Sequence, residues 1–276
     1  MPELPEVETV LRGIQPHIEQ QRINNVIVRQ RSLRWPIPHN LKAKLIDNKI
    51  IQLQRRAKYL LLKTNSGTLI LHLGMSGKFR ILSKNLPAQA HDHFDIEFAN
   101  KKILRFTDPR RFGACLWTEL DPLLHPLLKN LGPEPLTSDF SGKHLWLCAQ
   151  KRKIPIKAFI MDSKIVAGVG NIYAAEALFA ARIHPSTPVN IIAENQFQQL
   201  AKEIKDVLKQ AIKRGGTTLK DFLNSDGEPG YFENQLKVYG REGLPCKRCN
   251  SLLKTLAIGQ RASVFCEQCQ RPQTLF

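Results

Sequence analysis

The chain of 276 residues lacks any run of 18 or more apolar residues, the length that a helix needs to cross a bilayer. It also lacks the opening of a secretory signal, which is basic and then apolar. Its first nine residues, MPELPEVET, instead include three glutamates. We therefore predict neither a membrane-spanning helix nor an export signal.

Acidic residues are scarce, because 24 Asp and Glu stand against 41 Lys and Arg, for a net charge of +17 and a pI near 9.8. Such a surplus favours a polyanionic partner, since Lys and Arg displace the counterions condensed on phosphates. Charge alone favours nucleic acid over anionic membrane surfaces and other partners, and it leaves open a basic protein with no specific partner.

Cysteine is also scarce, but its spacing is informative. Four of the six cysteines form two Cys-x-x-Cys pairs near the C-terminus, with sixteen residues between the pairs. Two such pairs offer four thiolates to one tetrahedral Zn²⁺ at about 2.3 Å, and four protein ligands leave no open position for catalysis. Chance pairs of redox cysteines are the less favoured alternative. We predict one structural zinc, held by Cys246, Cys249, Cys266 and Cys269.

The first half of the chain has the pattern of a helix followed by many strands. Apolar residues at helical spacing predict a short amphipathic helix over residues 4–14. Seven or eight short β-rich runs follow up to residue 119, which is typical of a two-sheet sandwich or a barrel. The predicted strands are residues 26–28, 50–53, 59–62, 69–73, 79–82, 94–98, 103–106 and 114–117.

The second half is helical and ends in the cysteine-rich segment. Turn formers in LGPEPLTSDFSG, residues 131–142, indicate an interdomain linker, and the strands stop there. The predicted fold is α+β and multidomain, with an N-terminal helix and two-sheet β-sandwich, a central helical domain and a C-terminal zinc finger on a β-hairpin. We place these domains at residues 1–131, 132–237 and 238–276. The predicted helices of the second half are residues 142–150, 155–162, 171–181 and 194–213.

Two features of the helical region are candidates for phosphate contact. The glycines of AGVGN, residues 167–171, lead into an apolar helix near Asn171, and such a turn binds phosphate readily. An ordinary glycine turn before a core helix explains this spacing equally well. The basic run Lys151-Arg152-Lys153 is usually a solvated face, and phosphate contact is the alternative.

The first turn of the chain concentrates Pro2, Glu3, Glu6 and Glu8 in a basic protein. Matching of acidic residues to the helix dipole is the simplest explanation. The chemical alternative requires removal of Met1, because the nitrogen of Pro2 is otherwise an amide. A freed α-amine titrates near neutral pH, and its attack on a carbonyl-like carbon gives an iminium, with Glu3 placed to shuttle protons.

Seven blocks of the sequence resemble formamidopyrimidine-DNA glycosylase. They occur in order, span nearly the whole chain, and show no departure from the family pattern. The blocks are PELPEVET at 2–9, RRAKYLLL at 55–62, HLGMSG at 72–77, TDPRRFGA at 107–114, GVGNIYAAEALF at 168–179, GGTTLKDF at 215–222 and the cysteine finger.

The resemblance implies a role for each residue of the catalytic site. Pro2 of the mature chain is the nucleophile that attacks C1′ of the damaged nucleotide, and Glu3 is the general acid and base. Glu6 is a second carboxylate of the site. Lys58 lies near the lesion and its phosphates, and Arg261 of the finger binds a nearby phosphate and assists strand cleavage.

A base inside a duplex stack is out of reach, so the nucleotide must flip out and the vacancy must be filled. The resemblance assigns this wedge to Met75, Arg110 and Phe112, side chains that suit insertion into a stack. From the residues alone, core packing and surface charge explain them as well. The resemblance also implies a loop at 217–224 that closes over the flipped purine. It implies DNA contacts at Asn171, within a helix–two-turn–helix, and at His91, Arg110 and Lys157. A further contact lies at Arg152 or its neighbour Lys151. His72 is either a residue of the family's site or a core histidine.

We therefore predict a bifunctional DNA glycosylase and AP lyase of base excision repair, which removes oxidised purines through a Schiff base and cleaves the strand by β,δ-elimination. An endonuclease VIII-like glycosylase for oxidised pyrimidines and a catalytically silent binder of lesion DNA are the alternatives. A zinc-finger accessory factor is disfavoured, because about 240 residues precede the finger. The resemblance further implies double-stranded DNA as partner and a monomer in the bacterial cytoplasm, associated with the nucleoid.

Overall fold

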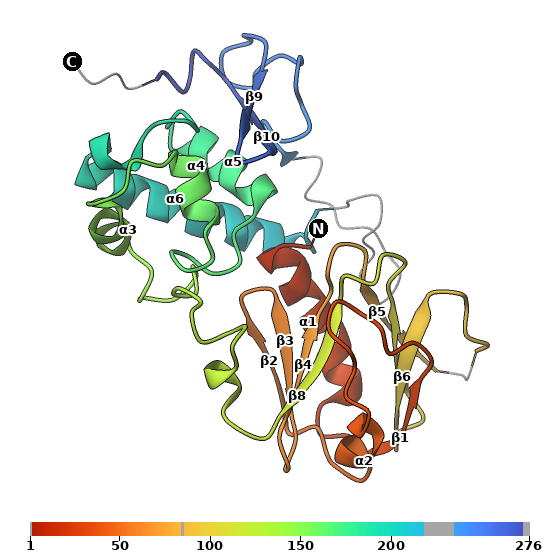
Figure 1. Cartoon of the computed structure of the whole chain (residues 1–276). Coiled ribbons are helices and arrows are strands. Elements are labelled where there is room, and N and C mark those ends of the chain that lie inside the picture. The colour runs from red at the N-terminus through yellow and green to blue at the C-terminus, as the bar shows by residue number, and fades with distance from the viewer. Residues whose placement is uncertain (1, 84–85, 218–234, 273–276) are drawn as a thin grey trace. The chain divides into compact units, whose positions relative to one another are not determined.

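The computed structural model describes residues 2–83, 86–217 and 235–272 (Figure 1). The chain divides into two compact units, the first formed by residues 1–130 and 214–233, and the second by residues 131–213 and 234–276. Among the described residues no helix combines the length and the apolar character needed to cross a bilayer.

The first unit contains two four-stranded sheets, with strand orders β1-β6-β7-β5 and β2-β3-β4-β8. All neighbouring strands in them are antiparallel, which confirms the predicted two-sheet sandwich. A short helix α2, Leu41–Leu45, was not predicted. The strands are β1 Ile23–Val28, β2 Gln52–Arg56, β3 Tyr59–Lys63, β4 Thr68–His72, β5 Lys78–Leu82, β6 Asp92–Phe98, β7 Ile103–Thr107 and β8 Ala114–Thr118.

Helix α1 spans Leu4–Ile18 and is one turn longer than the predicted 4–14. The predicted range ended at Ile14, the last apolar residue counted at helical spacing, and Pro16, which follows, cannot donate a backbone hydrogen bond. The helix nevertheless continues, since Ile14 and Ile18 are both fully buried and extend the apolar stripe by one turn. This stripe belongs to one hydrophobic core to which all eight strands contribute.

The second unit is helical, and its four helices agree with the predicted ranges to within one residue at each end. It also contains the hairpin of β9, Lys254–Ile258, and β10, Arg261–Phe265. Two short 3₁₀ helices, at Pro122–Leu124 in the first unit and Val189–Ile191 in the second, were not predicted. The helices are α3 Gly142–Ala149, α4 Ile156–Met161, α5 Asn171–Ala180 and α6 Glu194–Lys213.

The hairpin packs on α5 and shares a small core with it. Ala175 and Phe179 of α5 contact apolar residues of the finger, including Leu253 and Val264. The carboxylate of Glu176 accepts hydrogen bonds of 2.9 Å from three consecutive backbone N–H groups, at residues 237–239. The finger therefore has tertiary support besides its cysteines. The domain boundaries at 131/132 and 237/238 remain a prediction.

Candidate functional site

The N-terminal carboxylates are held by a network that starts at helix α1. Glu3 is the N-cap, and the backbone N–H of Glu3 donates to Oε2 of Glu6 at 2.9 Å in a capping box. Oε1 of Glu6 accepts from the backbone N–H of Thr217 at 2.9 Å and from its hydroxyl at 3.0 Å. Glu6 is fully buried, so this one side chain fixes the backbone beside Pro2 and the start of the segment after Gly216.

The predicted closing loop at 217–224 begins at this contact. Thr217 is its first residue, and residues 218–224 lie outside the part of the chain that the structure describes. Gly216 has a φ of +82°, and a Cβ there would lie 3.0 Å from Oε1 of Glu6. The positive φ and this close approach to the carboxylate both favour glycine at position 216.

Lys58 lies in the turn between β2 and β3, and this turn is tied to α1. The guanidinium of Arg55 donates to Oε2 of Glu8 at 2.9 Å and to the carbonyl of Ala57 at 3.0 Å. Ala57 has a φ of +53°, a backbone conformation that residues other than glycine rarely adopt. Arg55, which the sequence analysis did not single out, thus positions the turn that carries Lys58.

His72 lies at the end of β4 in a cationic environment. Its Nδ1 accepts the backbone N–H of Gly74 at 2.9 Å, and its ring lies 4.7 Å from that of Tyr59. Burial, together with the charges of Lys58 and Arg34, lowers the pKa of His72 to about 4. Because Nδ1 is an acceptor, the proton of the neutral ring sits on Nε2.

We expect His72 to stay neutral, as the Nε2–H tautomer, from pH 8 down to about pH 5, and nitrogen-detected NMR of the ring checks this. The unfolded ring protonates near pH 6.5 and the folded ring only near pH 4. Stability is therefore full above pH 6.5 and falls as the pH drops toward 4, by at most about 3 kcal/mol. The His72→Asn variant should not show this dependence of folding stability on pH. A ring that titrates near pH 6.5 would contradict the burial that we infer.

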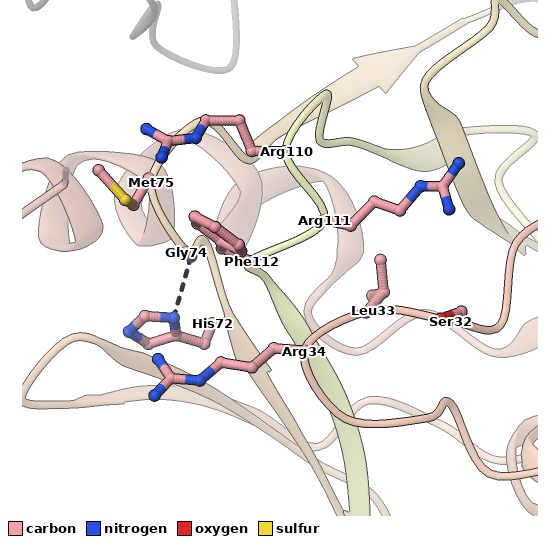
Figure 2. A pocket seen from close by; sticks show the side chains of 9 residues that line it. All are labelled: Ser32, Leu33, Arg34, His72, Gly74, Met75, Arg110, Arg111 and Phe112. Atoms are coloured by element: carbon pink, nitrogen blue, oxygen red, sulfur yellow. Dashed lines mark hydrogen bonds between the residues drawn. The ribbon is translucent and has the colours of Figure 1, made fainter.

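The residues predicted to fill the DNA stack come from two adjacent loops, 73–77 and 108–113 (Figure 2). Met75 is 38% exposed and Phe112 is 42% exposed, so neither side chain is buried in the core, which argues against the core-packing alternative. The guanidinium of Arg110 lies 4.8 Å from the centre of the Phe112 ring. Beside them is a pocket of about 550 Å³, lined by Ser32, Leu33, Arg34, His72, Gly74, Met75, Arg110, Arg111 and Phe112.

His91 is exposed at the end of a segment that is anchored to the sheet. The buried guanidinium of Arg105 donates to both oxygens of Asp95 at 2.8 Å and to the carbonyl of Leu86 at 2.9 Å. Burial opposes the charge of Asp95, but hydrogen bonds from Arg105 and Arg29 hold its pKa below the usual range. This ion-pair network fixes one end of the segment that carries His91.

The basic run and Asn171 belong to the second unit. Lys151 is exposed, whereas Arg152 lies 3.7 Å from a carboxylate oxygen of Asp162. Asn171 is the first residue of α5, and Gly168 in the preceding turn has a φ of +82°. The side-chain Oδ1 of Asn171 is buried and has no hydrogen-bond partner among the described residues. A buried polar atom without a partner is costly, so this side chain is suited to meet a ligand.

Lys157 is buried, with 1% of its surface exposed, although the family resemblance implies a DNA contact for it. Its ammonium donates to the carbonyl of Ala262 at 2.9 Å and to the hydroxyl of Ser263 at 2.7 Å. Both acceptors follow Arg261 on strand β10. This geometry favours a supporting role, in which Lys157 of α4 holds the strand that presents Arg261.

We expect Lys157→Met to lower the free energy of unfolding by about 1–3 kcal/mol, because the buried hydroxyl of Ser263 and the partly buried carbonyl of Ala262 lose their donor. The slope of log Kd against log salt for DNA binding should stay unchanged. If Lys157 neutralises a phosphate, that slope should instead fall by about 0.9. The matched control is Lys209→Met, at an exposed position of α6, which should change neither quantity, and denaturant melts with salt titrations measure both.

The four predicted cysteines come together in the finger. Their Sγ atoms all lie within 4.8 Å of one another, with 4.0 Å between Cys246 and Cys269 and 3.4 Å between Cys249 and Cys266. A tetrahedral ion with Zn–S bonds of about 2.3 Å requires separations of about 3.8 Å, so the cluster fits one zinc ion. Arg261 is exposed at the start of β10, between the two cysteine pairs in sequence.

The structure groups the predicted site residues by unit. The first unit brings Pro2, Glu3 and Glu6 together at the start of α1, and it also carries Lys58, His91 and the wedge residues. The second unit carries Asn171, Lys157, Arg261 and the cysteines. The supporting residues Arg55 and Glu176 were not predicted, although both lie inside the sequence blocks that carry the family resemblance.

Three family models match the chain in series. They are described as the formamidopyrimidine-DNA glycosylase N-terminal domain at residues 1–115, the formamidopyrimidine-DNA glycosylase H2TH domain at 131–223, and a zinc finger found in FPG and IleRS at 243–272. Formamidopyrimidine-DNA glycosylase of Pseudomonas aeruginosa strain LESB58 is 56% identical over 271 residues, which are 98% of this chain and 100% of that one. The protein of Stutzerimonas stutzeri strain A1501 is 54% identical over the same shares.

Solved structures agree along nearly the whole chain. MutM (Fpg) from Thermus thermophilus matches with a TM-score of 0.88 and 35% identity, over 99% of this chain and 100% of that one. Lactococcus lactis Fpg in complex with DNA containing an abasic site matches with a TM-score of 0.90 and 34% identity, over 98% of this chain and 99% of that one. MutM in complex with DNA containing carbocyclic 8-oxo-G matches with a TM-score of 0.88 and 34% identity, over 98% of this chain and 100% of that one.

Proposed function

Because the chain belongs to the formamidopyrimidine-DNA glycosylase family, we propose that this base-excision-repair glycosylase removes 8-oxoguanine and formamidopyrimidines from duplex DNA and then cleaves the strand as an AP lyase. The observation that carries the proposal is the arrangement at the N-terminus. The backbone beside Pro2 is fixed by the buried carboxylate of Glu6, and the carboxylate of Glu3 is 3% exposed next to it. A nucleophile and a proton carrier held this firmly suit covalent catalysis.

The reaction starts with the free secondary amine of Pro2 in a chain that has lost Met1. The nitrogen attacks C1′, the bond from C1′ to the base breaks, and the base leaves with a proton that Glu3 supplies and then recovers from the Pro2 nitrogen. Glu3 then protonates O4′ as the bond from C1′ to O4′ opens, which leaves an iminium between Pro2 and C1′. The iminium acidifies the C2′ protons, so β-elimination expels the 3′ phosphate, and a δ-elimination expels the 5′ phosphate. Water finally releases Pro2.

Cationic side chains hold the phosphates during these steps. Lys58 is partly exposed in its anchored turn, and Arg261 is exposed on β10, so both are accessible to DNA. His91, Arg110, Asn171 and the pair Lys151 and Arg152 contact the backbone around the lesion, while Lys157 supports β10. Met75, Arg110 and Phe112 enter the stack when the nucleotide flips, and their exposure on adjacent loops supports this role.

The zinc finger positions Arg261 and takes no direct part in the chemical steps. One zinc ion on Cys246, Cys249, Cys266 and Cys269 is structural, because four protein ligands leave it no open coordination site. When bound, the ion cross-links the two ends of the hairpin. The finger then presents Arg261 toward DNA. The partner is lesion-containing double-stranded DNA, consistent with DNA complexes of solved relatives and with the charge of +17. We infer a monomer in the bacterial cytoplasm, associated with the nucleoid.

A panel of duplexes tests the lesion class. We expect base release and strand incision with 8-oxoguanine opposite cytosine and with a formamidopyrimidine, and at least about tenfold lower kcat/KM with an oxidised pyrimidine. The reverse ranking would identify an enzyme for oxidised pyrimidines. Binding to all lesions without base release would identify a silent DNA binder.

A further inference from the structure

The two loops that carry the wedge residues are interlocked. Gly74 has a φ of +67°, and a Cβ there would lie 2.4 Å from the backbone carbon of Phe112 and 2.5 Å from the nitrogen of Gly113. The loop of Met75 therefore lies directly on the backbone of the loop that carries Arg110 and Phe112 (Figure 2). A shift of either loop would move the other.

Asp108 is the group that fastens the two loops to each other. It is fully buried, and its Oδ1 accepts the hydroxyl of Ser76, in the Met75 loop, at 2.7 Å. On its own loop, Oδ1 accepts the backbone N–H of Arg110 at 3.3 Å and Oδ2 accepts that of Gly113 at 2.8 Å. The N–H of Arg110 also lies 3.3 Å from the hydroxyl oxygen of Ser76.

The backbone of Asp108 is fixed to the sheet as well. Its carbonyl accepts Nε2–H of His93, on β6, at 2.6 Å, and its N–H donates to the carbonyl of His91 at 3.0 Å. Asp108 thus joins the two wedge loops through its side chain and ties them to β6 through its backbone carbonyl. The side chain itself is buried and has no direct access to DNA.

We propose that Asp108 is a positioning residue for base flipping, which holds Met75, Arg110 and Phe112 in the geometry that enters the DNA stack. This inference rests on the proposed glycosylase function. A carboxylate suits the position because both oxygens accept, whereas an asparagine would turn one of them into an NH₂ group that faces donors. Wedge insertion into intact duplex should then become slower, while the chemistry at Pro2 and Glu3 remains.

The test compares two substrates in single-turnover reactions of the full-length protein. The first is 8-oxoguanine opposite cytosine, which requires unstacking. The second is an abasic site opposite a one-nucleotide gap, which has no base to unstack and no partner to separate. We expect Asp108→Asn to lower excision from the first substrate by about 10- to 100-fold, since small misplacements carry penalties of this size. Cleavage of the second substrate should stay within about twofold of the parent protein.

Two further variants keep the test decisive. Ser76→Ala removes only the bond between the loops, so it should show the same preference with a smaller effect, even if Asp108→Asn fails to fold. Asp47→Asn makes the same substitution at an exposed aspartate of the same unit and should change neither rate. Equal losses on both substrates, or no loss on the first, would overturn the inference. A parent protein inactive on both substrates would instead overturn the proposed function.

Discussion

Replacement of Glu3 by glutamine is expected to lower the rate of 8-oxoguanine release by about 10²–10⁴-fold, the usual contribution of a general acid–base. Glutamine keeps the size of the side chain and an acceptor oxygen for the capping box. It cannot deliver a proton to the departing base or to O4′ of the sugar, so base loss and ring opening should both slow. Single-turnover release of the base measures this directly.

The comparison needs a control for charge and for fold. Glu194→Gln removes the same charge from an exposed position at the start of α6, and we expect it to leave the rate unchanged. The Glu3 variant should melt at nearly the parent temperature, because Glu6 still accepts the backbone N–H of residue 3. Base release by Glu3→Gln at the parent rate would show that another group transfers the proton.

Removal of zinc is expected to abolish strand cleavage and to reduce DNA binding to the non-specific level. Structural zinc in isolated fingers contributes about 10–16 kcal/mol of apparent binding free energy at pH 7, which the small hairpin cannot replace by its own core. Without the metal, the strand that carries Arg261 should lose its geometry. Lys157 and Glu176 are expected to retain part of the packing on α4 and α5.

Elemental analysis should find one zinc per chain in the parent protein and none in Cys266→Ser. The matched control is Cys148→Ser, at a partly buried cysteine of α3 outside the cluster. It should keep one zinc and full activity. Parent-like cleavage by a zinc-free Cys266→Ser protein would contradict a structural need for the ion.

Local patterns predicted the elements of this fold well. Alternation of apolar residues located all eight strands of the sandwich, and helical patterns located the four helices α3, α4, α5 and α6 of the second unit. The cysteine spacing predicted a metal cluster because its ligands lie in two tight turns. The end of α1 was wrong by one turn, since the burial of Ile18 by the sandwich offsets the backbone bond that Pro16 cannot make.

The supporting contacts of the site could not be predicted, because they join residues that are far apart in the sequence. Glu6 and Thr217 are separated by 211 positions, and Ser76 and Asp108 by 32. No periodicity or spacing rule connects such pairs. Likewise, Lys157 lies beyond a basic run in the sequence, and only the packing of α4 against β10 shows that its ammonium is buried. The roles of Pro2, Glu3 and Arg261 came from the family resemblance.

Borohydride trapping tests the central claim, that the nitrogen of Pro2 forms the Schiff base. A protein confirmed by mass spectrometry to start at Pro2 is mixed with a duplex that contains 8-oxoguanine opposite cytosine, reduced, digested and sequenced by tandem mass spectrometry. We predict one covalent adduct, on the Pro2 nitrogen, that disappears when Met1 is retained. An adduct on Lys58 or another lysine, or no adduct from this protein, would contradict the account.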